Sequence, residues 1–368
     1  MEIKEKIDGW FEHFHANPEI SYQEVKTTET LTEILTEMGV AYRTFDDVTG
    51  VVAEIGEGEE IIAIRADIDA LWQEVDGVFK ANHSCGHDAN IAMVLGALSY
   101  LKDEPLDGKI RFIFQPAEEQ GNGAVAMVER GVIDDVSYLF GVHLRPIEEI
   151  PHGKILPAIH HGAAAFLEGK VTGVDAHGAR PHQGKNVVDP LFAIHQFIKT
   201  IYFSPYEAYS AKMTKIQAGG NNVNIIPGTA TFAIDTRAQS NAVLDELMKK
   251  IEHGIESIGN LYGVEIELEW NDYTPAAEVS EEAAQIATDA ILEVVGEEGY
   301  APSVITAGSD DFHFYTIHRP ALKAAMLGIG ADLQPGLHHP KMTFNKEALD
   351  TGARVLAETL RKAFLHKP

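Results

Sequence analysis

The segment NHSCGHDAN, residues 82–90, brings together side chains that bind metals or act as nucleophiles. It contains the only cysteine of the 368-residue chain, Cys85, two residues before His87. Thiolate and imidazole are ligands that suit zinc and neighbouring transition metals. A single cysteine on its own is more often a small buried apolar side chain. Its role therefore depends on which other residues accompany it.

Further ligand-type residues follow three runs predicted to be buried strands, residues 61–65 (IIAIR), 110–114 (IRFIF) and 138–142 (YLFGV). Each run is almost continuously apolar, as expected for parallel strands covered on both faces. The residues that come next are Asp67 and Asp69, Glu118 and Glu119, and His143, while GLHHP supplies His338 and His339 near the other end of the chain. Open parallel sheets bind ligands beyond the carboxyl ends of their strands, so we expect these side chains to converge.

The set exceeds what one tetrahedral ion needs, and it therefore predicts two metal ions, which in hydrolases lie roughly 3.5–4 Å apart. A thiol hydrolase with Cys85 as nucleophile is one alternative, but it leaves the other ligand-type residues unused. A non-catalytic binding protein is a second alternative, but such a protein would be free to lose a carboxylate such as Glu118, which could act as a general base. GNGAVA (residues 121–126) matches part of a dinucleotide fingerprint, but Glu118 and Glu119 just before it would repel a pyrophosphate.

The elements that must position these residues have a clear pattern in the first part of the chain. Apolar residues between 91 and 101 predict a helix between the first two strands, which favours an α/β fold with a doubly wound, mostly parallel sheet. SYQE, Ser21–Glu24, matches a capping box and predicts a helix that ends at Gly39. The last helix is predicted from about Asn345.

The middle of the chain has a different pattern. VEIELEW (residues 264–270) and TATFAIDTR (residues 229–237) alternate apolar and polar residues, which is typical of antiparallel strands with one exposed face. Two helices are predicted here, one with Pro190 at its first position. We therefore predict a catalytic domain of residues 1–162 and 274–368, into which residues 163–273 insert a smaller domain with an antiparallel sheet and two helices.

The amino-acid composition limits the binding partners and the cellular compartment that we expect. The chain has 56 acidic against 29 basic residues, a formal net charge of -27, which disfavours nucleic acid and anionic membranes. One cysteine cannot form an internal disulfide, which fits a reducing compartment. The first ten residues contain no secretory apolar segment, and no apolar run approaches the ~20 residues of a membrane span. These observations predict a cytoplasmic protein.

Nine motifs, in order, carry a resemblance to a known family over essentially the whole chain. They are NPEISYQE, RADIDAL, HSCGHD, QPAEE, GVH, DAHGARPH, NIIP, GSDDF and LHHPKMTF. The sequence resembles the di-metal amidohydrolases and peptidases that include aminoacylases, hippurate hydrolase, indole-acetyl-amino-acid hydrolases and N-acetyl-diaminopimelate deacetylase. It is most similar to bacterial aminoacylase-type amidohydrolases.

The resemblance implies a role for each matching residue. Two divalent ions, zinc or manganese with cobalt and nickel as further options, would be held by Cys85, His87, Glu119, His143 and His338. Glu118 would be the general base, and Asp69 would orient a ligand. The role of Asp67 is left open by the motif match, and His339 is not expected to be a ligand.

The resemblance also implies that the inserted domain is a lid and dimerisation domain of a homodimer. His177 would stabilise the oxyanion, often across a dimer interface, while Asn224 and Arg237 would contact the substrate. The expected substrates are small N-acyl amino acids, with metallo-dipeptidase or carboxypeptidase activity as the alternative. Trp72 and Asn90 depart from the family pattern near the predicted site, where they would affect the substrate preference.

Overall fold

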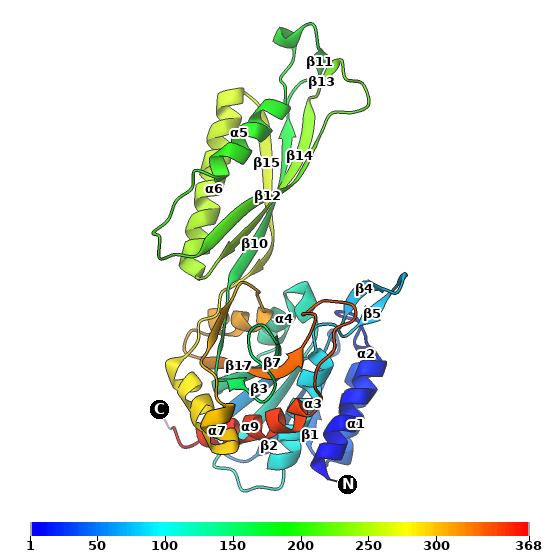
Figure 1. Ribbon diagram of the computed structural model, residues 1–368, viewed down its shortest axis with the longest axis vertical. Coiled ribbons are helices and arrows are strands. Elements are labelled where there is room, and N and C mark those ends of the chain that lie inside the picture. Colours follow the sequence, from blue (N-terminus) through cyan, green and yellow to red (C-terminus); the bar gives the residue numbers. More distant parts are fainter. Residues whose placement is uncertain (1, 367–368) are drawn as a thin grey trace. The chain divides into compact units, whose positions relative to one another are not determined.

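The computed structural model describes residues 2–366, which divide into two compact units (Figure 1). The smaller unit comprises His161–Ala277 together with the short segment Thr306–Ser309, and the rest of the described chain forms the larger unit. The sequence pattern does not predict the second segment. It joins the smaller unit through the Gly162 N–H, which lies 3.1 Å from the Thr306 carbonyl oxygen and 3.0 Å from that of Gly308.

The larger unit is built on a seven-stranded sheet in the order β1-β2-β6-β3-β7-β17-β8. The strands are β1 (Ala41–Arg43), β2 (Val51–Gly56), β3 (Ile61–Asp67), β6 (Lys109–Gln115), β7 (Val136–Pro146), β8 (Ile155–Leu156) and β17 (Lys323–Leu333). The four central strands run parallel, and the outer pairs β1–β2, β2–β6 and β17–β8 are antiparallel. The three strands predicted from the apolar runs are confirmed as β3, β6 and β7.

The side chains of the large sheet pack into two separate hydrophobic cores, one on each face. In β3, Ile62, Ile64 and Ala66 pack into one core, while Ile61 and Ala63 pack into the other. Neighbouring strand residues point to opposite faces, so both faces are covered and the strand reads as a continuous apolar run. The predicted α/β class, with a sheet covered on both sides, is confirmed.

The helices of the larger unit lie on these two faces (Figure 1). They are α1 (Ile3–Ala16), α2 (Val25–Glu37), α3 (His87–Leu101), α4 (Gly123–Glu129), α7 (Glu281–Gly299), α8 (Phe314–His318) and α9 (Ala348–Ala363). Helices α1, α3, α7 and α9 pack against one face, and α4 and α8 against the other. The predicted last helix is confirmed, although it begins at Ala348 rather than near Asn345.

The predicted capping box is wrong. Helix α2 begins at Val25, its N-cap is Glu24, and no side chain of that residue caps the helix. The hydroxyl group of Ser21 instead donates to Asp69. The carboxylate of Glu19 takes over the capping role, because its Oε2 accepts the Thr27 N–H at 2.8 Å. The motif therefore marks a helix start correctly but assigns its side chains to the wrong partners.

The smaller unit contains a four-stranded antiparallel sheet in the order β12-β14-β10-β15, with α5 and α6 packed on one face. Its elements are β10 (Ala163–Thr172), α5 (Val188–Ile198), β12 (Tyr209–Ala218), β14 (Thr229–Ala238), α6 (Asn241–Tyr262) and β15 (Glu265–Thr274). In β15, Ile266, Leu268 and Trp270 pack against the core, while the intervening glutamates are exposed. Both alternating strand predictions, β14 and β15, are confirmed.

Helix α5 begins at Val188, so Pro190 is its third residue and the prediction of Pro at the first position is wrong. The Val188 N–H is satisfied by the side chain of Asn186. A short ribbon, β11 (Ala176–His177) with β13 (Ile225–Ile226), extends this unit. None of the helices within residues 2–366 is both long and apolar enough to cross a membrane.

Short strand pairs and turns connect the longer elements. The hairpin of β4 (Leu71–Val75) and β5 (Val78–Asn82) leaves the Trp72 side chain exposed. Strand β9 (Ile159–His161) pairs with β16 (Val304–Thr306). The 3-10 turns are η1 (Glu118–Gln120), η2 (Pro181–Gln183) and η3 (Asp311–His313).

Candidate metal centre

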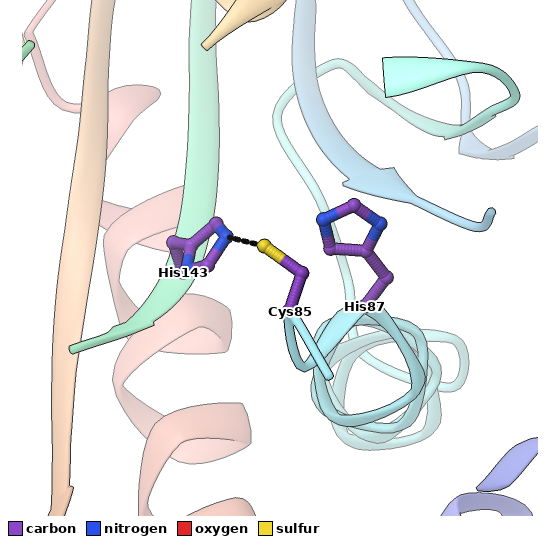
Figure 2. Close-up of side chains that lie close together, drawn as sticks. All are labelled: Cys85, His87 and His143. Atoms are coloured by element: carbon purple, nitrogen blue, oxygen red, sulfur yellow. Dashed lines mark hydrogen bonds between the residues drawn. The ribbon is translucent and has the colours of Figure 1, made fainter. Parts of the chain in front are cut away.

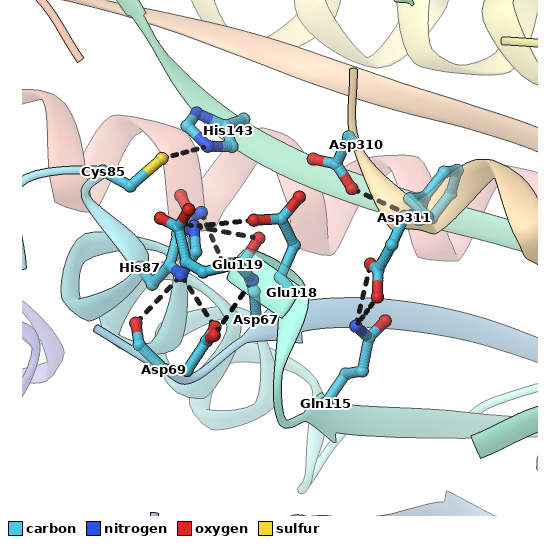
Figure 3. A network of polar contacts seen from close by, with 12 residues as sticks. Asp67, Asp69, Cys85, His87, Gln115, Glu118, Glu119, His143, Asp310 and Asp311 are labelled. Atoms are coloured by element: carbon cyan, nitrogen blue, oxygen red, sulfur yellow. Dashed lines mark hydrogen bonds and ion pairs between the residues drawn. The ribbon is translucent and has the colours of Figure 1, made fainter. Parts of the chain in front are cut away.

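The candidate ligands of the larger unit converge at the carboxyl-terminal edge of its parallel strands, as predicted (Figure 3). Strand β3 ends at Asp67, and β6 is followed by the turn η1, which carries Glu118 and Glu119. His143 lies within β7, and His87 is the first residue of α3. The chain thus delivers side chains from four elements to one place.

Cys85 faces His143 (Figure 2). The Cys85 Sγ lies 3.5 Å from the His143 Nε2. The His143 Nδ1 lies 2.7 Å from the carbonyl oxygen of Leu144, which can only accept, so Nδ1 carries the proton of the neutral ring. The Nε2 lone pair therefore points toward the thiol, in the orientation a metal ligand needs.

His87 is oriented in the same way by Asp69. Its Nδ1 lies 2.9 Å from the Asp69 carbonyl oxygen and 3.2 Å from Asp69 Oδ1. The other carboxylate oxygen, Asp69 Oδ2, accepts the backbone N–H of Glu119 at 3.0 Å. Asp69 therefore ties the imidazole ring of His87 to the turn that carries the glutamate pair.

His338 completes the cluster from the loop between β17 and α9. Its Nε2 lies 3.5 Å from Glu119 Oε1, and its backbone N–H donates to the carbonyl oxygen of Ser84 at 2.8 Å. The residue has a φ of 63°, an unfavourable value for a side chain with a Cβ. The Nδ1 of His339, in contrast, accepts the Lys341 N–H, and His339 belongs to none of the ligand groups among the described residues.

The donor set fits divalent cations. Within residues 2–366, five groups of three side chains offer ligand atoms within 4.8 Å of one another. Two of these groups share Cys85 and together contain all five predicted ligands: Cys85, His87 and His143 in one, and Cys85, Glu119 and His338 in the other. The His87 Nε2 and the Glu119 Oε1 are buried and have no hydrogen-bond partner. Bound cations would satisfy these atoms, which otherwise bear a desolvation cost.

The pKa shifts of the two glutamates in the cluster also support a cation site. Burial raises the pKa of Glu119 to about 7, although His87 opposes the shift. Burial together with Asp310 raises the pKa of Glu118 well above its usual range. Buried carboxyl groups that resist ionisation are expected where positive charge is missing, and a bound cation would supply that charge.

The same shifts argue against Cys85 as a nucleophile paired with His143. Burial and the charge of Glu119 raise the pKa of the Cys85 thiol well above its usual value. Burial also lowers the pKa of His143 to about 4. A thiol nucleophile needs the opposite, a thiolate beside an imidazolium.

The prediction from sequence missed a buried ion-pair network beside the cluster. The Arg65 side chain is fully buried, and its guanidinium contacts Asp67 at 2.5 Å, Asp311 at 2.7 Å and Asp310 at 3.3 Å. Asp67 also accepts from Asn90 at 2.8 Å, so it acts as a partner of Arg65 and Asn90. An arginine near the end of an apolar strand could have indicated a buried ion pair. Its two partners in GSDDF, however, lie far away in the sequence.

In the smaller unit, the structure brings His177 and Asn224 together. His177 ends β11 and pairs with Ile225 of β13, and the Gly178 N–H donates to the Asn224 carbonyl oxygen at 2.7 Å. The His177 Nδ1 accepts the Ala179 N–H at 3.0 Å, so the neutral ring carries its proton on Nε2. The exposed Nε2–H is therefore a free hydrogen-bond donor at the end of this ribbon.

Arg237 does not join this pair. It lies near the last residue of β14, eight residues beyond Thr229, which at the rise of a strand corresponds to about 26 Å. Its Nε and Nη2 each lie within hydrogen-bond distance of the Asp235 carboxylate, at 3.2 and 3.3 Å, and its Nη1 donates to the Ala307 carbonyl oxygen. Within one chain, His177, the predicted oxyanion contact, is thus far from Arg237, the predicted contact to a substrate carboxylate.

Comparison with known proteins gives consistent matches. The model of peptidase family M20/M25/M40 matches residues 63–362. An IAA-amino acid hydrolase of Arabidopsis thaliana, ILR1-like 4, is 30% identical over 95% of this chain and 84% of its own length. An N-acetyl-L-cysteine deacetylase of Bacillus subtilis is 30% identical over 98% of this chain and 88% of its own. A solved Bacillus subtilis structure, described as a dinuclear metal-binding peptidase of the M20 family, is 26% identical, covers 99% of both chains and has a TM-score of 0.86.

Proposed function

The chain belongs to peptidase family M20/M25/M40, and from that membership and its ligand cluster we propose that it is a metal-dependent amidohydrolase that cleaves N-acyl amino acids. The relatives named as an amino acid conjugate hydrolase and an N-acetylcysteine deacetylase support this substrate class. The single observation that carries the proposal is the pair of three-residue ligand groups that share Cys85. Two ions held by these groups are the cofactor we propose, with zinc or manganese favoured by the thiolate, imidazole and carboxylate donors.

Bound ions would polarise the amide carbonyl group and lower the pKa of an attacking water. The protein's own part in the reaction is proton transfer by Glu118. Its Oε2 lies 3.8 Å from the His87 Nε2, so the carboxylate borders the ligand cluster without belonging to either of the two groups that share Cys85. Glu118 would accept a proton from water and return it to the leaving amine, which yields a carboxylate and a free amino acid.

His177 would donate its Nε2–H to the oxyanion that develops on the substrate carbonyl group. Asn224 would lie beside it on the same ribbon and contact the substrate. Because Arg237 is far from both along β14, we propose that the contacts come from different subunits of a homodimer. Arg237 would bind a substrate carboxylate in place of Asp235, whose carboxylate it now pairs with in the same two-point manner.

The substitution Glu118→Gln tests the proton-transfer role. We expect about two metal ions per chain in wild type and variant alike, because Glu118 is in neither Cys85 group, and a fall in kcat of about 10²–10⁴-fold on N-acetyl amino acids. The control Glu129→Gln changes an exposed glutamate of helix α4 and should leave both quantities unchanged. Full activity of Glu118→Gln would remove this residue from the mechanism.

A chelator separates this proposal from a thiol hydrolase. Metal removal should abolish activity, and zinc or manganese should restore it, whereas a thiol enzyme would be indifferent. A panel of N-acyl amino acids and unmodified dipeptides distinguishes the aminoacylase from the dipeptidase alternative. Faster cleavage of dipeptides at equal concentration would replace the proposed substrate class. The single buried free cysteine fits a cytoplasmic location, which we also propose.

A further inference from the structure

The segment Ser21–Glu24, between α1 and α2, lies against the ligand cluster and has no part in the proposed proton transfer. Ser21 and Glu24 are buried, with 6% and 0% of their surface exposed. Neither side chain caps helix α2, and both instead make hydrogen bonds to residues far along the chain. Buried polar side chains must be hydrogen-bonded, and when they do not bond to neighbours in the sequence, their distant partners indicate what they hold in place.

Ser21 acts on Asp69. Its hydroxyl group donates to Asp69 Oδ2 at 2.6 Å, in a buried contact. The same oxygen accepts the Glu119 N–H, and the other oxygen faces the His87 Nδ1. The carboxylate is therefore held at both oxygens by three groups, and two of these groups belong to proposed metal ligands. Without Ser21, the carboxylate could turn about its last bond and lose its contact with the His87 ring, which would then be held by the Asp69 carbonyl oxygen alone.

Glu24 acts on the turn that carries the glutamate pair. Its Oε1 accepts the N–H of Ala117 at 2.9 Å, and its Oε2 accepts the hydroxyl group of Thr49 at 2.6 Å. Ala117 has a φ of 54° and a ψ of 40°, a left-handed conformation that is unfavourable for a residue with a Cβ. The turn needs this conformation immediately before Glu118. The hydrogen bond from the Ala117 N–H to the buried carboxyl group of Glu24 compensates for the strain.

The segment is itself fixed to strand β3. Ile20 pairs with Ala70 in a parallel bridge, and the Ala70 N–H donates to the Glu19 carbonyl oxygen at 2.8 Å. Ala70 comes directly after Asp69. The segment therefore connects the end of β3, which carries Asp69, with the end of β6, which carries the glutamate pair.

We propose that Ser21 and Glu24 are positioning residues that hold Asp69 and the Ala117 turn so that His87, Glu118 and Glu119 face the bound metal. This inference rests on the proposed function, because the positioned groups are its ligands and its base. Outer contacts of this kind typically change metal affinity or activity by 10–100-fold. Ser21 acts through the ligands alone, whereas Glu24 acts on both ligand and base.

The test compares Ser21→Ala, Glu24→Ala and the conservative Glu24→Gln by zinc titration of the metal-free protein and by kinetics at saturating metal. We expect Ser21→Ala to weaken zinc binding about 10-fold or more while kcat recovers at high zinc. Glu24→Ala should lower both zinc affinity and kcat, with KM unchanged. Glu24→Gln keeps an oxygen for Ala117 and should restore both.

Glu33→Ala changes an exposed glutamate on the adjacent helix α2 and is the matched control. Variants of Ser21 and Glu24 that bind zinc and turn over substrate like this control would overturn the inference. If Glu24→Ala does not fold, Thr49→Val, which removes only the hydroxyl group that holds Glu24, carries the same test. Wild type that binds zinc but cleaves no N-acyl amino acid would refute the proposed function alone, because the affinity comparison still decides the positioning roles. Wild type without affinity for zinc would refute both.

Discussion

At the scale of single residues, the larger unit buries three aspartates around the guanidinium group of Arg65. Three aspartates surround one guanidinium, and Gln115 adds a neutral contact, with its Oε1 accepting from Arg65 Nε at 2.9 Å. Burial opposes the charge on Arg65, but the three aspartates raise its pKa well above the usual value. One positive charge thus faces three carboxyl groups, and burial raises the pKa of one of them, Asp311, to about 7.

Replacing Arg65 should therefore destabilise the folded protein. In Arg65→Met the aspartates lose their buried counter-charge, and we expect the free energy of unfolding of the metal-free protein to fall by about 3–5 kcal/mol. Lys4→Met is the control, since Lys4 pairs with Asp8 at the surface, where such pairs contribute about 1 kcal/mol or less. Urea denaturation of both variants measures the difference. Equal losses would mean that the aspartates do not depend on Arg65 for their charge balance.

At the scale of elements, helices α1, α3 and α9 pack closely enough to require a glycine in α3. A Cβ on Gly96 would lie 2.6 Å from Ile7 Cδ1 and 2.7 Å from Ala353 Cβ. Gly96→Ala should therefore destabilise the protein by about 1–3 kcal/mol despite the better helix propensity of alanine. In Gly9→Ala, at an open position of α1, nothing lies within 4 Å, and we expect a gain of up to about 1 kcal/mol. Opposite signs in urea denaturation are the expected result, and a gain in both variants would contradict the close packing.

The contact between α1 and the start of α3 should depend on pH. His15 Nδ1 lies 2.6 Å from Asp88 Oδ2, and this hydrogen bond raises the pKa of His15. A raised pKa in the folded state means that the stabilisation is complete below the unfolded value of about 6.5 and is lost as the pH rises through the folded value. The stability difference between wild type and His15→Gln should shrink from up to about 1 kcal/mol near pH 6 toward zero near pH 9. His13→Gln controls for the loss of an imidazole group from α1, and a difference that grows with pH would refute the pairing.

At the scale of the whole molecule, the main proposal is that His177 serves the site of a partner subunit. Mixing Glu118→Gln with His177→Ala, after dissociation and reassembly, tests this directly. In a mixed dimer, one site would then combine an intact Glu118 with an intact His177, so activity should return to about a quarter of that of wild type. If His177 serves its own chain, every site lacks one of the two groups and no activity returns. Sedimentation of the mixture measures whether dimers are present.

The sequence by itself determined the central strands of the large sheet, the alternating strands of the smaller unit and the candidate ligands near them. The strands β3, β6 and β7 were predictable because a strand covered on both faces is apolar at every position, which is a local property. For the same reason, Glu118, Glu119 and His143 could be named from the residues that follow the predicted strands, whereas Cys85 and His87 were named from their residue types. His338 required the assumption that distant loops meet at one edge of a sheet.

Only the tertiary structure decided how the polar side chains are paired. SYQE has the spacing of a capping box, but the buried carboxylate of Asp69 competes for the Ser21 hydroxyl, and the strained turn at Ala117 takes Glu24. Arg65 finds Asp310 and Asp311 from across the chain for a similar reason. A buried polar atom must find a partner wherever folding places one, so its choice depends on neighbours that sequence distance does not reveal.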